Sequence, residues 1–153
     1  MRTAPIDIRP FSIERDLAQL RSWWDGHQAI HTPEVLLQRG WIASGGGVDI
    51  AACFMFLDEQ IGIGVVEYMT TNPKMAFSSD MLAAVKQLYA RVEAEARAKG
   101  CLAILSFVKP DTGESRLLVK LGYARSQQDP GHIIYAKPLF EGAPPPPKDG
   151  IIH

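Results

Sequence analysis

Residues 78–99, together with the apolar run that follows them, constrain the fold of this chain most strongly. Apolar side chains recur along this segment at helical spacings: Met81, Leu82, Val85, Leu88, Tyr89, Val92 and Ala96. Such spacing predicts an amphipathic helix. Gly100 is a typical residue at a helix end, and "CLAILSFV" at 101–108 has the unbroken apolarity of a strand covered on both faces. We therefore expect a long helix packed against a sheet.

The first forty residues predict a strand and two helices. Apolar and polar residues alternate in "IDIRPF", which is the pattern of a strand. Ser12 can cap the helix that follows. The apolar stripe of that helix consists of Ile13, Leu17, Leu20 and Trp24. A second helix is expected after Thr32 and Pro33, with its end near Gly40.

The middle of the chain is rich in strand-forming residues. Three runs, "WIAS", "VDIAACFMFL" and "IGIGVVEYMTT", are separated by "GGG" and "DEQ". Linkers this short favour antiparallel hairpins. Gly62 and Gly64 fall within the third run, where glycine often marks a bulge or a close approach of the backbone.

The last third predicts a short helix and a closing hairpin. Asp111, with Glu114 three residues later, has the spacing of a capping box that opens the helix "ESRLLVKLG". "YARSQQ" and "HIIYAK" flank a Pro-Gly turn at 130–131 and predict a hairpin. Four consecutive prolines within 141–153 predict a polyproline II extension or linker. The expectation is an α+β fold class, with one domain at 1–140 and a Pro-rich tail at 141–153.

Composition narrows the classes of function. The formal net charge is −1, with 46% hydrophobic and 22% charged residues, so we expect neither nucleic acid nor an acidic membrane surface as a partner. No run has the length and apolarity of a membrane helix or a signal peptide, which favours a cytoplasmic protein. Cys53 and Cys101 stand in apolar runs and are expected to be buried thiols. No Cys/His spacing indicates a metal site, so no metal is expected.

The order of these elements, from about residue 5 to 139, resembles that of the GNAT superfamily of acyl-CoA-dependent N-acyltransferases. The resemblance rests on "GIGVVEYMTTNPKM", the helix from Ser78, "CLAILSFVKPDTGESRLLVKLGYA" and the last hairpin. Its most specific part is "LLVKLGY" after "VKPDTGES". The family resemblance implies a central, mixed and mostly antiparallel sheet of six to seven strands flanked by about four helices. It also implies transfer of an acetyl group from acetyl-CoA to an amine by direct attack in a ternary complex.

The resemblance also implies where acetyl-CoA would bind. The pantetheine arm would enter a V-shaped opening between the strands at about 61–71 and 101–108, an arrangement that offers unpaired backbone N–H and C=O groups to an amide-rich ligand. The cofactor-binding candidates are Val66, Tyr68 and Met69 on the strand, Ala76, Phe77, Ser78, Ser79 and Asp80 at the start of the long helix, and Ser115 in the short helix. The long helix would direct its N-terminal N–H groups at the pyrophosphate.

Two departures from the family pattern bear on activity. The segment "KMAFSSDM" has neither glycine nor arginine where the family usually carries both in its pyrophosphate loop, and Asp80 would oppose an anion there. The alternative is a Ser-capped helix without a ligand. Leu118 occupies the position where many members carry a tyrosine that protonates the leaving thiolate, and Tyr123 is expected to be a core residue. A catalytically inactive GNAT-fold binding or assembly module, still able to hold acyl-CoA, is therefore the second hypothesis.

Four further residues are candidates on the acceptor side. Glu67 is the candidate catalytic base, because a partly desolvated carboxylate can accept the proton of an ammonium substrate; the alternative is an exposed strand carboxylate. His27 and His31 are acceptor-site candidates or solvated loop residues. Trp23 lines the acceptor site, forms a homodimer contact or is partly buried, since two adjacent helical tryptophans are not expected to face inward together.

Overall fold

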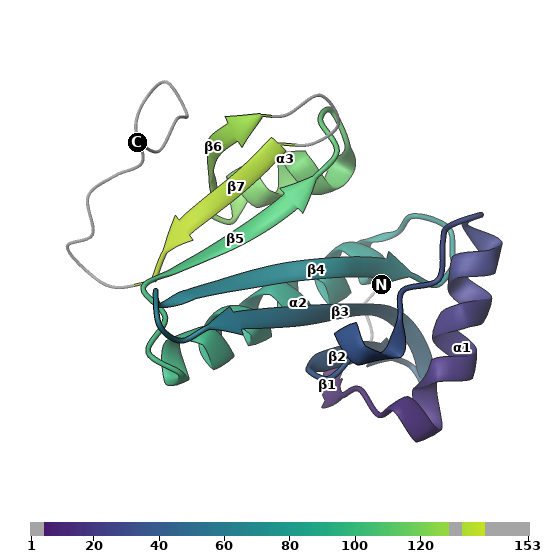
Figure 1. The fold of residues 1–153 in the computed structure, drawn as a ribbon. Helices are drawn as coiled ribbons and strands as arrows, with labels where there is room; N and C mark the ends of the chain where they lie inside the picture. Colours follow the sequence, from purple (N-terminus) through teal and green to yellow (C-terminus); the bar gives the residue numbers. More distant parts are fainter. Residues whose placement is uncertain (1–4, 129–132, 140–153) are drawn as a thin grey trace. The chain divides into compact units, whose positions relative to one another are not determined.

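The computed structural model describes residues 5–128 and 133–139. Its strands are β1 Ile6–Pro10, β2 Gly40–Gly45, β3 Val48–Asp58, β4 Ile63–Thr71, β5 Ala103–Val108, β6 Ala124–Gln128 and β7 Ile133–Pro138. Its helices are α1 Ile13–Gly26, α2 Ser79–Ala98 and α3 Gly113–Lys120, and a 3-10 turn, η1, spans Glu34–Leu36 (Figure 1). The long helix and the strands predicted from periodicity are thus confirmed.

The strands form one seven-stranded sheet in the order β1-β2-β3-β4-β5-β7-β6. β4 and β5 are parallel, whereas β1 with β2, β2 with β3, β5 with β7 and β6 with β7 are antiparallel. The predicted α+β class and mixed, mostly antiparallel sheet are confirmed. In the described residues, the second helix expected after Pro33 is only the single turn η1. Because β2 already begins at Gly40, the segment between them is too short for a stable α-helix.

The chain divides into two compact units. The first comprises Met1–Met55 and Tyr68–Val92, and the second comprises Phe56–Glu67 and Glu93–His153. The single domain expected for residues 1–140 stays a prediction. The turn at 130–131, His132 and the Pro-rich segment 141–153 lie outside the described residues.

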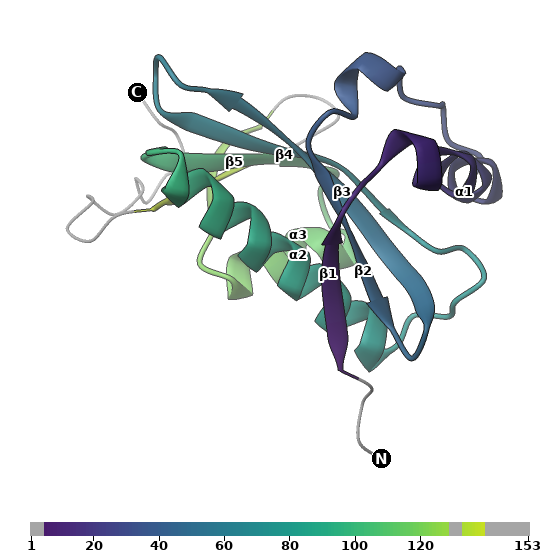
Figure 2. The same ribbon diagram turned by 90° about the horizontal axis from the view of Figure 1, so that it is seen from below.

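In the first unit, helix α1 covers one face of β2 and β3 (Figure 2). The buried cluster between them consists of Leu17, Leu20, Trp23, Trp24, Leu37, Ile42, Ala52 and Phe54. Trp23 and Trp24 are each only 4% exposed, so the expectation that both could not face inward is wrong. Leu37, just after η1, belongs to the same cluster. The segment that contains Leu37 therefore encloses α1 together with the sheet.

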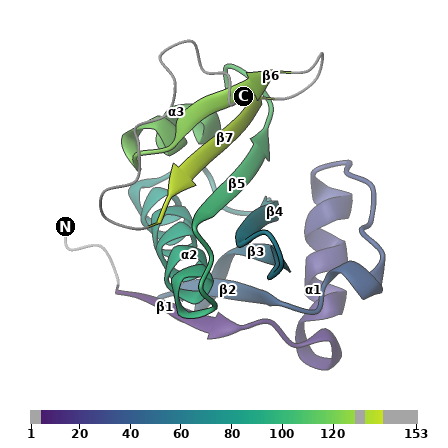
Figure 3. The same ribbon diagram turned by 60° about the vertical axis from the view of Figure 1, so that its left-hand side comes forward.

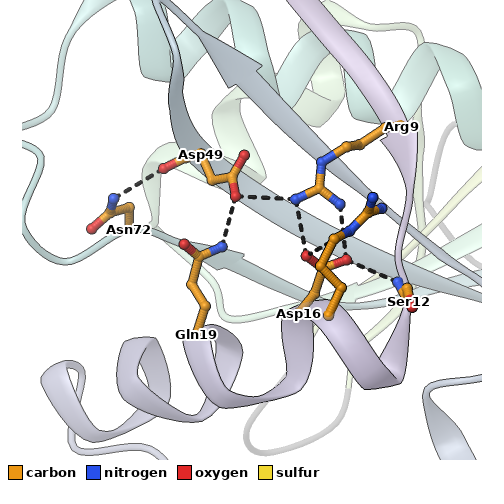
Figure 4. Close-up of polar contacts among 7 residues, drawn as sticks. Arg9, Ser12, Asp16, Gln19, Asp49 and Asn72 are labelled. Carbon is orange, nitrogen blue, oxygen red and sulfur yellow. Dashed lines mark hydrogen bonds and ion pairs between the residues drawn. The ribbon is translucent and has the colours of Figure 1, made fainter.

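A buried ion pair joins β1 to α1 (Figure 4). The Arg9 guanidinium donates to both carboxylate oxygens of Asp16, at 2.8 and 2.9 Å, and to Asp49 Oδ2 at 3.1 Å. Burial raises the pKa of Asp16, but the hydrogen bonds and charge of Arg9 and the Ser12 N–H lower it further, so the pKa lies below its ordinary value. Ser12 occupies the N-cap position as expected, although its hydroxyl makes no capping bond and its N–H instead donates to Asp16 at 2.9 Å.

In the second unit, β7 pairs with β5 on one side and β6 on the other, beside α3 (Figure 3). The α3 capping box starts one residue later than predicted: Thr112 Oγ1 accepts from Ser115 N–H, and Ser115 Oγ accepts from Thr112 N–H. Asp111 instead has a φ of 58°, which keeps it outside the helix. Lys137 Nζ lies 2.5 Å from Glu93 Oε1 and donates to Leu121 O at 2.6 Å.

Both cysteines are buried, as predicted. The glycines of the third β-run behave differently from each other: Gly62 has a φ of 71° just before β4, and Gly64 is buried within it. Over the described ranges, no helix has the length and apolarity needed to cross a membrane.

Candidate functional site

The first unit brings the end of β4 against the end of α1. Trp24 Nε1–H donates to Thr70 Oγ1 at 3.2 Å, and His27 Nε2 lies 2.7 Å from the Thr71 carbonyl oxygen. Gly26 packs so closely on the loop after β4 that an added Cβ would lie 2.5 Å from Pro73 Cγ. Strand β4 is therefore held at consecutive residues by the last turn of α1.

Two histidines lie at this junction, and their contacts indicate which ring nitrogen donates a hydrogen bond. A carbonyl oxygen can only accept, so His27 Nε2 carries the proton and Nδ1 of the neutral ring keeps a lone pair. His31 Nε2 lies 2.7 Å from Asp25 Oδ1, and its ring centroid lies 5.6 Å from that of Trp24. An imidazole that donates through Nε2 can accept a proton at Nδ1 when the ring is neutral, which is the chemistry required of a general base.

The backbone of β4 is irregular at Tyr68. Its φ is 56°, a left-handed conformation that is a genuine outlier for a bulky residue. Thr70 Oγ1–H donates to the Tyr68 carbonyl at 3.0 Å, and the Tyr68 side chain packs against the cluster around α1. The parallel pairing of β4 with β5 runs from Ile63 to Val66, so the irregular residue lies beyond those paired residues.

The loop from β4 to α2 is anchored at Asn72. Asn72 Nδ2 donates to the Asp49 carbonyl at 2.9 Å, and Asn72 N–H donates to the Ile50 carbonyl at 2.8 Å; Figure 4 shows the side-chain contact. The same Asp49 accepts from Arg9 and from Gln19 through Oδ2. The loop is thereby tied to the buried ion pair between β1 and α1.

The start of α2 is a Ser-capped helix. Ser78 Oγ accepts from Met81 N–H at 3.2 Å, which satisfies one of the free N–H groups of the first turn. Ala76 and Ser79 are exposed, and Phe77 is 78% exposed. Asp80 Oδ1 is buried and makes no hydrogen bond within the described residues. These features agree with the alternative of a Ser-capped helix without a ligand. If a ligand binds there, the Ser79 hydroxyl and the other backbone N–H groups of the first turn are the groups left to donate to it.

The remaining candidates belong to the second unit. Val66 is 2% exposed and Glu67 is half-buried on β4. Ser115 is 5% exposed, and its hydroxyl donates to the Thr112 carbonyl within the capping box. Leu118 is fully buried, and Tyr123 is buried as expected.

In the first unit, His31 lies beside Trp24, His27 contacts Thr71 and Tyr68 packs against the apolar cluster, while Trp23 lies inside that cluster. Sequence reasoning assigned Trp24 to the core alone and did not single out Thr70. No local signal marks either role, because an indole donor and a strand threonine are both ordinary in a core. Among the described residues, no group of three or more His, Cys, Asp or Glu side chains is placed to hold a metal ion.

Neither a protein-family model nor a curated protein matches this sequence. Solved structures do match. The PaiA N-acetyltransferase of Thermoplasma acidophilum, in complex with coenzyme A, is 16% identical over 88% of this chain and 99% of its own, with a TM-score of 0.63. The ribosomal-protein-S18-alanine N-acetyltransferase of Escherichia coli is 14% identical over 91% and 97%, with a TM-score of 0.63. The chain has the GNAT fold.

N-acetylglutamate synthase of Neisseria gonorrhoeae, complexed with coenzyme A and L-arginine, has the same GNAT fold in part of its length. It is 15% identical over 90% of this chain, with a TM-score of 0.71, and this chain spans only 34% of the synthase. At such identities the likeness establishes the fold. The family resemblance expected from the order of elements is therefore confirmed at the level of architecture.

Proposed function

We propose that the chain is an N-acetyltransferase that moves an acetyl group from acetyl-CoA to an amine by direct attack in a ternary complex. The observation that carries this proposal is the GNAT fold, which about nine-tenths of the chain shares with solved structures of N-acetyltransferases. The left-handed Tyr68 supports it, because strained backbone in a strand re-aims peptide groups and is common at functional sites.

The donor acetyl-CoA is proposed to contact Val66, Tyr68 and Met69 through the β4 backbone, where an N–H would polarise the thioester carbonyl. The pyrophosphate is proposed to take the start of α2, at Ala76, Phe77, Ser78, Ser79 and Asp80, with Ser115 from α3 as a further candidate. Since Ser78 already caps α2, backbone N–H groups and Ser79 would supply most of the hydrogen bonds.

On the acceptor side, Glu67 is proposed to take the proton that the ammonium must lose before it attacks. The amine nitrogen then forms a bond to the thioester carbonyl carbon, the C–S bond breaks, and the thiolate of coenzyme A leaves with the electron pair. Once bonded to the acyl carbon, the nitrogen loses its second proton, and water is proposed to carry that proton to the thiolate, since Leu118 offers no acid. His27 and His31 are proposed to border the acceptor, whereas Trp23 lies within the core cluster.

A binding module without chemistry is the second candidate. The buried, unbonded Asp80 Oδ1 at the start of α2 favours it, because a carboxylate there opposes bound phosphate by roughly 0.3–1 kcal/mol. The fully buried Leu118 favours it as well, because loss of a general acid commonly slows a reaction by about 10²–10⁴-fold.

The two candidates are separated by measuring thiol release from acetyl-CoA across a panel of small amines, peptides and lysine-containing acceptors. Amine-dependent release supports the enzyme, and coenzyme binding without release supports the module. Glu67→Gln is expected to remove the acidic limb of the pH–rate profile, whereas Glu59→Gln, at an exposed carboxylate of the β3–β4 turn, leaves it unchanged. An unaltered profile in Glu67→Gln would remove Glu67 from the mechanism.

A further inference from the structure

Three groups of the first unit form a directional chain of hydrogen bonds. Trp24 Nε1–H donates to Thr70 Oγ1 at 3.2 Å, and Thr70 Oγ1 donates to the Tyr68 carbonyl oxygen at 3.0 Å. Trp24 is 4% exposed and Thr70 is 8% exposed. The chain therefore runs through a largely water-free interior, from the last turn of α1 to the strand.

The direction of this chain follows from chemistry. An indole N–H can only donate and a carbonyl oxygen can only accept. The Thr70 hydroxyl therefore accepts a hydrogen bond from Trp24 and donates its own proton to the Tyr68 carbonyl oxygen. A hydroxyl that accepts one bond becomes a better donor in the next. Valine has the shape of threonine but cannot replace it here, because it neither accepts nor donates a hydrogen bond.

The last hydrogen-bond acceptor in this series is the backbone carbonyl of Tyr68, the residue in the left-handed conformation. Tyr68 has a φ of 56°, and such a conformation persists in a bulky residue only where its surroundings impose it. The carbonyl is fixed by the Thr70 hydroxyl, while the side chain packs on the cluster that contains Trp24. His27, three residues after Trp24, contacts the carbonyl oxygen of Thr71, the residue that follows Thr70.

We propose that Trp24 and Thr70 are positioning residues that hold Tyr68 in its left-handed conformation and thereby shape the backbone of β4 for the acyl donor. The role of these two residues in donor binding rests on the proposed function. The hydrogen-bond relay itself, from Trp24 through Thr70 to the Tyr68 carbonyl, rests on contacts within the first unit. Because α1 carries Trp24 and His27, the relay ties the helix next to the proposed acceptor side to the strand proposed to bind the thioester.

The test compares three variants by NMR and by coenzyme binding. Thr70→Val removes the hydroxyl with little change of shape, and Thr70→Ser keeps it. Trp24→Phe removes the indole donor together with part of the buried ring system. Thr71→Val is the matched control, since its hydroxyl lies 3.4 Å from His27 Nε2 and outside the relay. The readouts are solvent exchange of the Trp24 indole proton, the ¹³Cα and ¹³Cβ shifts of Tyr68, and the Kd for acetyl-CoA and for desulfo-CoA.

In Thr70→Val we expect indole exchange to accelerate by about tenfold or more, Tyr68 shifts to move toward extended values, and acetyl-CoA Kd to rise by about tenfold. Thr70→Ser should restore all three, and Trp24→Phe should weaken binding in the same direction. If Thr70→Val does not fold, Trp24→Phe and Thr70→Ser still decide the matter through the Tyr68 shifts.

Left-handed Tyr68 shifts that persist in both Thr70→Val and Trp24→Phe would overturn the proposal. So would wild-type coenzyme affinity in both. Failure of the wild-type protein to bind any coenzyme, with the exchange and shift changes as expected, would instead overturn the proposed function and leave the relay in place.

Discussion

The ion pair of Arg9 with Asp16 yields the sharpest stability prediction. Asp16→Asn removes the negative charge while keeping the shape and an oxygen that accepts from Ser12 N–H. The Asp16 side chain is 3% exposed and that of Arg9 is 29% exposed. Breaking a buried pair by removing one partner costs about 3–5 kcal/mol. Arg9 keeps its contact with Asp49 at 3.1 Å and is itself partly exposed, so we expect a loss at or just below the lower end of that range, about 2–3 kcal/mol.

The loss should depend on pH in a defined direction. Because the folded-state pKa of Asp16 lies below its ordinary value of 3.8, the stabilisation is complete above that value and disappears as pH falls through the lower folded-state pKa. The wild-type protein should therefore lose its advantage over Asp16→Asn in acid, while the advantage stays constant around neutral pH.

Urea unfolding followed by tryptophan fluorescence measures this, at about pH 7 and about pH 3. Glu14→Gln serves as control, because Glu14 is an exposed acid in the first turn of the same helix and should contribute less than about 1 kcal/mol. A change below about 0.5 kcal/mol in Asp16→Asn at neutral pH, or an equal change at both pH values, would refute the reasoning.

Three further substitutions at helix ends are tested with the same unfolding assay. Gln28→Gly should stabilise the protein by about 1 kcal/mol, since Gln28 has a φ of 55° after α1 and glycine adopts that conformation without strain; an unchanged urea midpoint would contradict this. Thr112→Ala should cost about 1 kcal/mol through loss of the α3 cap. Asp111→Asn should change stability by only a few tenths of that, because asparagine tolerates the left-handed conformation, and the reverse ranking would restore Asp111 as the cap.

The elements that sequence predicts well are those with a long, regular pattern. Residues 78–99 carry more than five turns of helical spacing, and the observed helix is Ser79–Ala98. The unbroken apolar run 101–108 likewise becomes β5, which pairs with β4 and β7. The long helix buries one continuous apolar face, and its pattern records this directly. In β5, buried residues alternate with more exposed ones and Phe107 is 39% exposed, so the expected cover on both faces is incomplete.

Tertiary context decides the elements that sequence reasoning misjudged. Trp23 is buried beside Trp24 because Leu37 and the sheet enclose α1 together, which no helical spacing within residues 13–26 reveals. Two overlapping cap motifs begin at Asp111 and Thr112, and the left-handed φ of Asp111 leaves Thr112 as the cap. A pattern of residue types does not distinguish such neighbours.

The candidate site shows the same division. Tyr68 was singled out through the family resemblance, but its left-handed conformation has no sequence signal, since glycines stand instead at 62 and 64. Asp16 forms a buried ion pair with Arg9, which no spacing of residue types indicates. Contacts between different helices and strands determine both outcomes.

The most direct test of acetyl-CoA binding is the melting temperature of the protein with acetyl-CoA, free CoA or desulfo-CoA. A ligand that binds the folded state at about 100 times its Kd adds about 2.7 kcal/mol of stability, which for a chain of this size is a rise of roughly 5–10 °C. Our account predicts such a rise with all three coenzymes. An unchanged melting temperature with every one of them at millimolar concentration would contradict the proposed acetyl-CoA site.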